Sequence, residues 1–167
     1  MTPMLKRYRY SIATFLVFCL IGVLARWAIG RVYFAGEALQ LMNSLASSGL
    51  YLGSAAATAS ATVIALMLTL TGMIRKMDTE FDQPVWQAID RVSQLSIISL
   101  LASLLLLLAL VFPIGEFEKL PANWFMRLYD ALFALTVLVT ALLSATAVLL
   151  YSTLRAVIRQ ITPTTDV

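Results

Sequence analysis

The chain has no histidine and only one cysteine, and these shortages exclude much of enzyme chemistry. Without imidazole there is no histidine base, no bis-histidine haem site and no common zinc centre. Cys19 cannot form a disulfide within the chain, so helix packing must stabilise the fold. No CxxC or HExxH motif and no glycine-rich phosphate loop occurs. We therefore expect a protein that is not an enzyme, with no catalytic residue, no cofactor and no metal ion.

Charge is the second shortage. Only 13% of the 167 residues are charged and 60% are hydrophobic, whereas about 25% of the residues of a soluble domain are charged. The mean hydropathy is +0.88. The net charge of +3 is dispersed, without the basic patch and interleaved aromatic residues that nucleic acid requires. This composition predicts an all-α integral membrane protein whose partner is the lipid bilayer, and no nucleic-acid partner.

Four uncharged runs divide the chain into membrane spans. We expect transmembrane helices over about 10–30, 50–74, 92–113 and 129–152, which together form a four-helix bundle. Residues 1–160 then make a single transmembrane domain, and residues 161–167 make a disordered cytoplasmic tail. The basic start and the sequence Val23-Leu24-Ala25 also resemble a cleavable signal peptide, but we expect a retained helix.

Two amphipathic stretches adjoin these spans. Residues 31–48 carry apolar side chains at helical spacing with polar ones on other faces, which is typical of an interfacial amphipathic segment. Farther along, Pro84 suits the first turn of a helix that Asp82 or Gln83 would cap. This second stretch runs into the third span, so the sequence predicts a cytoplasmic helical extension there.

The distribution of basic residues predicts the orientation. With four spans, eight basic residues lie on the side of the termini and four on the other side. Because basic residues accumulate on the cytoplasmic side, we expect both termini in the cytoplasm and the spans in the plasma (inner) membrane. The eight are Lys6, Arg7, Arg9, Arg75, Lys76, Arg91, Arg155 and Arg159.

The stretch from Gly53 to Thr62 is the most unusual part of the chain. It contains no residue larger than threonine and lies in the longest uncharged run, 38–74. Small residues let helix backbones approach closely, so we expect this helix to be the central one. The expected contact row repeats every fourth position: Gly49, Gly53, Ala57, Ala61 and Ala65. On the third span, Ser96, Ser99 and Ser103 are spaced to face it.

A row of hydroxyls occupies another face of the second helix, namely Ser54, Thr58, Thr62 and Thr69. In an oligomer this row could line a water-filled pore, because hydroxyls replace part of an ion's hydration without binding it tightly. The alternative is that these hydroxyls bond their own helix backbone or a neighbouring helix. The four residues are our candidate pore-lining site.

Three carboxylates are candidate charges at the outer mouth of such a pore: Glu116, Glu118 and Asp130. Arranged as a ring, they would concentrate cations. The alternative is that they are solvated loop charges that anchor helix ends. Asp130 could also be partly buried and pair with Arg127, three residues earlier on the same helix. The uncharged runs themselves contain no carboxylate, which disfavours ion-coupled transport.

These patterns predict a self-associating membrane protein, and more finely a homo-oligomeric ion channel with the second helix lining the pore. Four helices enclose little beyond their own packing, so the pore would require several copies. The alternative is an accessory or assembly subunit of a larger membrane complex. Such a subunit would dock through the small-residue helix and the interfacial segment.

Overall fold

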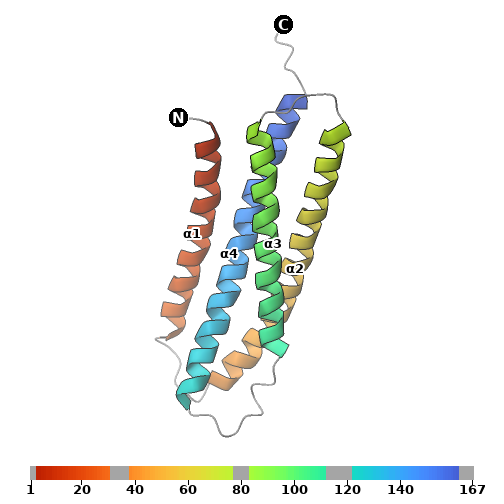
Figure 1. Cartoon of the computed structure of the whole chain (residues 1–167). Helices are drawn as coiled ribbons and strands as arrows, with labels where there is room; N and C mark the ends of the chain where they lie inside the picture. Colours follow the sequence, from red (N-terminus) through yellow and green to blue (C-terminus); the bar gives the residue numbers. More distant parts are fainter. Residues whose placement is uncertain (1–2, 31–37, 77–82, 112–121, 162–167) are drawn as a thin grey trace.

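The computed structural model describes residues 3–30, 38–76, 83–111 and 122–161, and each range is one α-helix (Figure 1). The helices are α1 (Pro3–Gly30), α2 (Ala38–Lys76), α3 (Gln83–Val111) and α4 (Ala122–Ile161). Each contains a stretch long and apolar enough to cross a membrane: Arg9–Ala28, Ser44–Ile74, Val85–Val111 and Arg127–Ile158. The predicted all-α architecture of four helices is therefore confirmed.

All four helices begin before the predicted spans, α2 by the most. α2 begins at Ala38, so residues 38–48 of the expected interfacial segment are the first turns of α2, whereas 31–37 lie outside the described residues. No proline, which would break a helix, lies within 38–74. α3 begins at Gln83 with Pro84 in its first turn, as predicted, and continues unbroken through the expected extension. Most of the expected tail, 162–167, lies outside the described residues.

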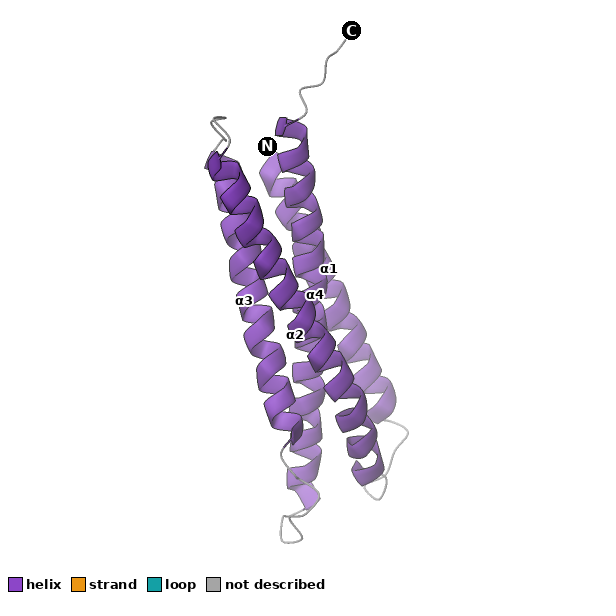
Figure 2. Cartoon of the chain, turned by 90° about the vertical axis from the view of Figure 1, so that its right-hand side faces the viewer, coloured by secondary structure: helices purple, strands orange, loops and turns teal. Residues whose placement is uncertain are grey.

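The four helices form one elongated bundle, with the start of α1 and the end of α4 at the same end (Figure 1). α4 packs against all three other helices, while α1 packs almost entirely on α4. Figure 2 views the bundle from the side of α2, which packs chiefly on α3. In an apolar 18-residue stretch of each span, 39% of the residues are buried in α4, against 22% in α2 and 11% in α1. The central helix is therefore α4, and the expectation that α2 holds this place was wrong.

The geometry of a long helix explains why the row of every fourth residue on α2 does not make a continuous contact. Such a row turns by about 40° per step, so Ala65 points about 160° away from Gly49. Gly49 and Gly53 do lie against α3, but Ala65 is exposed. The buried face instead alternates three- and four-residue steps and includes Gly49, Gly53, Ala56, Ser60, Met67 and Ile74.

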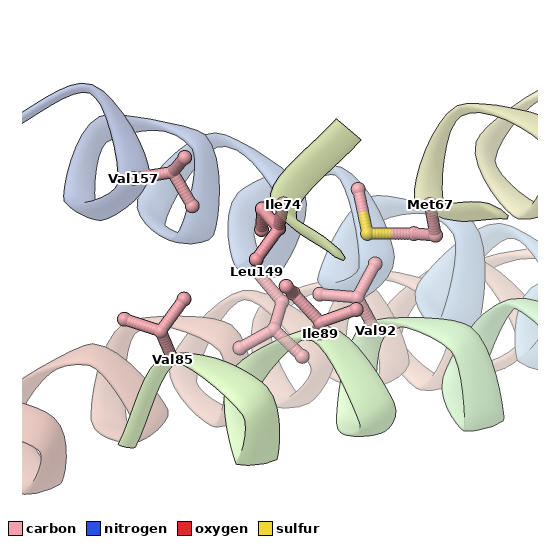
Figure 3. Packing of buried hydrophobic residues seen from close by; sticks show 7 residues of the cluster. All are labelled: Met67, Ile74, Val85, Ile89, Val92, Leu149 and Val157. Carbon is pink, nitrogen blue, oxygen red and sulfur yellow. The ribbon is translucent and has the colours of Figure 1, made fainter. Parts of the chain in front are cut away.

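The interior consists of two apolar clusters with a polar layer between them. Figure 3 shows the first cluster, which draws on α2, α3 and α4 and contains Met67, Ile74, Val85, Ile89, Val92, Leu149 and Val157. The second contains Ala56, Leu106, Leu110, Leu132 and Val139. Between them along α2 and α3, the Ser60 hydroxyl donates a 3.0 Å hydrogen bond to the Ser99 hydroxyl.

The serine series therefore faces inward, as predicted. Ser96, Ser99 and Ser103 are all completely buried, and Ser99 contacts the small-residue helix directly. Ser96 and Ser103 donate to carbonyls of their own helix, those of Val92 and Leu100. Buried side chains thus occupy the centre of the bundle, and these buried serines bond either to a serine of α2 or to carbonyls of their own helix.

Candidate functional site

The predicted hydroxyl row lies together on the outward face of α2. Ser54, Thr58, Thr62 and Thr69 are all exposed. Ser54 and Gly72 are 18 residues apart, which is five complete helical turns, so the row stays on one face along its length. The same geometry places this face roughly opposite the one that packs on α3. We call these four residues the hydroxyl row.

The threonines of the hydroxyl row bond to their own helix. Thr58 donates to the Ser54 carbonyl at 2.9 Å, and Thr62 donates to the Thr58 carbonyl at 2.8 Å. Thr69 donates likewise to the carbonyl of Ala65 at 2.9 Å. Backbone bonding, the alternative that the sequence left open, is therefore the arrangement in the single chain. Each hydroxyl oxygen keeps its lone pairs, so the row presents acceptors to its surroundings.

The surroundings of the hydroxyl row differ from the outward faces of the neighbouring helices. Over 97–111 of α3 the exposed residues are large and apolar, such as Leu101, Leu105 and Leu108 at 57–63% exposure. α1 is similar, with Leu16, Leu20, Val23 and Leu24 outward. On α2, small residues lie exposed beside the hydroxyl row: Ala55, Ala61, Ala65 and Gly72. The outward face of α2 thus carries a band of small and hydroxylated residues, with the exposed Leu66 and Leu68 on either side of it.

The candidate mouth charges are not assembled into one site. Glu116 and Glu118 lie outside the described residues. Asp130 lies on α4, and its Oδ1 is 2.5 Å from a guanidinium nitrogen of Arg26 on α1. The expected pairing with Arg127 was wrong, because Asp130 pairs with Arg26 of α1 and not with a residue of its own helix. The Arg26 guanidinium carbon also lies 5.7 Å from the ring centre of Tyr129, within reach of a cation–π interaction.

The sequence places Arg26 and Asp130 at the same level of the bundle but does not identify them as a pair. The two residues mark the end of the first span and the start of the fourth, and the predicted topology puts both ends on the same side of the membrane. Because α1 packs beside α4, the two charges lie at the same height along the bundle. The sequence did not indicate that α1 packs against α4.

The predicted site residues that the structure describes therefore belong to two separate polar features. The hydroxyl row on α2 is neutral and faces away from the bundle. The ion pair carries two opposite charges and joins α1 to α4. No protein-family model, curated protein or solved structure matches this chain.

Proposed function

We propose that this chain is a non-enzymatic integral membrane protein that self-associates through the outward face of α2 and conducts ions between the associated copies. The observation that carries the proposal is the position of the hydroxyl row. It lies on the face of α2 opposite the packed face, where only lipid or another protein can meet it.

Self-association follows from the size of the residues on this face. Lipid tails are as apolar as leucine, so helices in a membrane associate through close packing and hydrogen bonds rather than through hydrophobicity. Ala61, Ala65 and Gly72 permit a second backbone to approach closely. The outward leucines of α3 suit lipid contact instead.

Conduction follows from the acceptors that the hydroxyl row presents. The buried side chains of the two apolar clusters fill the bundle interior, so a water path would run between copies of the chain. Several copies arranged with α2 inward would place rings of hydroxyl oxygens along such a path. These rings would replace part of an ion's hydration shell while holding no fixed charge.

Crosslinking tests the interface. In a chain with Cys19 replaced by serine, we expect Thr62→Cys to form disulfide-linked dimers in the membrane. Leu101→Cys is the matched control: Leu101 is exposed on α3, two residues from Ser99, as Thr62 is two residues from Ser60. The mass of the purified particle gives the number of copies. Equal crosslinking at both positions, or a particle of one copy, would contradict self-association through α2.

Ion flux in reconstituted vesicles tests conduction. We expect Thr62→Leu to abolish flux while the particle mass stays the same, because leucine fills the path and removes a hydroxyl ring. Ala147→Leu adds similar bulk to an exposed position of α4 and should leave flux unchanged. If the unmutated protein passes no ions, or if the Thr62→Leu variant still passes them, the proposed conduction is refuted. Co-purification of a different membrane protein bound at α2 would favour the accessory subunit.

A further inference from the structure

A groove of about 570 Å³ lies between α1 and α4, outside the part of the bundle used for the proposed function. Its α1 wall includes Cys19, Val23 and Trp27, and its α4 wall includes Phe133, Ala134 and Leu138. On α1 these residues recur every fourth position, and on α4 they fall as the neighbouring pairs 133–134 and 137–138, so each wall is a single helical face. The volume falls within the range of roughly 300–1,000 Å³ that is usual for ligand sites.

The groove is open to the outside of the bundle. Val23 and Trp27 on its margin are 66% and 62% exposed, and Leu138 is 39% exposed. Small residues shape the groove. Gly22 lets α1 approach Val137 closely, and Ala134 adds only a methyl group to the α4 wall, which leaves the groove open there. In a bilayer, an outward apolar groove of this kind faces hydrocarbon chains.

Charge is confined to one end of the groove, where Arg26 and Asp130 pair. This end coincides with the ends of the apolar spans Arg9–Ala28 and Arg127–Ile158, and so with a membrane surface. From Asp130 to Leu138 the groove extends about 12 Å along α4. One leaflet of the hydrocarbon core is about 15 Å thick, half of the roughly 30 Å total. The groove thus matches a single lipid of one leaflet in two respects: its length, and its having a polar end at the membrane surface and an apolar remainder.

The two charges at this end restrict the headgroup. The side chains of Arg26 and Asp130 remain 32% and 45% exposed. Arginine has five N–H donors and only part of them can meet Asp130, so donors remain for a phosphate. The carboxylate attracts a cation and repels an anion, and because Oδ1 is buried against Arg26, the second carboxylate oxygen is the one left for a cation. A site with one positive and one negative group complements a zwitterion better than a net anion.

We propose that this groove binds one phospholipid whose acyl chain lies between α1 and α4, with its phosphate on Arg26 and a primary ammonium group on Asp130. The exposed indole of Trp27 lies at the level where aromatic side chains meet lipid headgroups. The site rests on the membrane location in the proposed function and is independent of self-association and of conduction.

Native mass spectrometry of the full chain, released from vesicles of equal parts phosphatidylethanolamine and phosphatidylglycerol, tests the site. We expect retained phosphatidylethanolamine to exceed phosphatidylglycerol by about tenfold, or about 1.4 kcal/mol. Ala134→Phe fills the groove and should lower retention by a similar factor, whereas Ala147→Phe, exposed on the same helix, should not. Asp130→Asn leaves Arg26 unopposed and should shift retention toward phosphatidylglycerol.

A second measurement needs no variant of the protein. A phosphatidylethanolamine with a photoactivatable acyl chain should crosslink the wild-type chain within 133–138. Equal retention of both lipids by the wild type, unchanged retention in Ala134→Phe, or crosslinks confined to other helices would overturn the proposal. The native mass spectra also give the number of copies in the particle. A single copy carrying phosphatidylethanolamine would refute self-association alone, and an oligomer without it would refute the lipid site alone.

Discussion

Replacing Gly22 with alanine should weaken the attachment of α1 to α4. A Cβ atom at this position would lie 2.4 Å from Cγ1 and 2.6 Å from Cγ2 of Val137. Carbon atoms in favourable contact are about 3.5–4.0 Å apart. Valine in a helix is held in one preferred rotamer, so its methyl groups cannot turn away and α1 itself must shift. Since α1 packs almost entirely on α4, no other helix compensates.

The size of the effect follows from two opposing terms. Overpacking of a close contact costs about 1–3 kcal/mol. Alanine also favours a helix over glycine by about 1 kcal/mol. Gly72→Ala isolates this second term, because nothing lies within 4 Å of the Cβ that it would add. The difference in unfolding free energy between the two variants should therefore be about 1–3 kcal/mol, the packing cost alone.

Equilibrium unfolding in mixed detergent micelles measures this difference. Adding Val137→Ala to the Gly22→Ala variant removes both opposing methyl groups, so the two changes should show a favourable coupling in a double-mutant cycle. The labelling rate of Cys19, which lies in the groove between these helices, gives a local reading of α1 separation. If Gly22→Ala is as stable as Gly72→Ala, or if Val137→Ala gives no coupling, the close approach of α1 and α4 at Gly22 is refuted.

Two further experiments test the interior. Met67→Ala, in the first apolar cluster, should cost about 2–5 kcal/mol of unfolding free energy, while Leu68→Ala, at 75% exposure, should cost far less in the same titration. A cycle of Ser60→Ala and Ser99→Ala should give a coupling of about 0.6 kcal/mol, the average for hydrogen bonds between membrane helices. A coupling indistinguishable from zero would mean that this bond does not stabilise the bundle.

The number and approximate extent of the helices could be predicted from the sequence. A membrane span requires about 20 apolar residues, and the charged residues around Arg75 and Asp90 separate the runs clearly. The inward direction of Ser99 was also predictable, because a hydroxyl in an apolar helix gains most from a polar partner on a neighbouring helix. Pro84 correctly marked the start of α3, since proline suits the first helical turn.

The order of packing could not be predicted in the same way. In a membrane protein the outward face is as apolar as the inward one. The sequence therefore does not reveal that Leu106 is buried whereas Leu101 is exposed. The small residues around Gly53 correctly indicated close packing, but not that α4 would be central. The partner of Asp130 depended on that same order. The hydroxyl row was predicted as a set, and its role stays a prediction.

The dependence of α1 on α4 has a consequence for the order of events during synthesis. Arg26 and Asp130 are separated by about a hundred residues, and chains are made at about 5–20 residues per second. For roughly 5–20 seconds after α1 is made, its partner does not yet exist. During that interval Arg26 lacks Asp130 as a partner, and the groove beside it has only one wall. Of the four described helices, the one made earliest is thus among the last to dock.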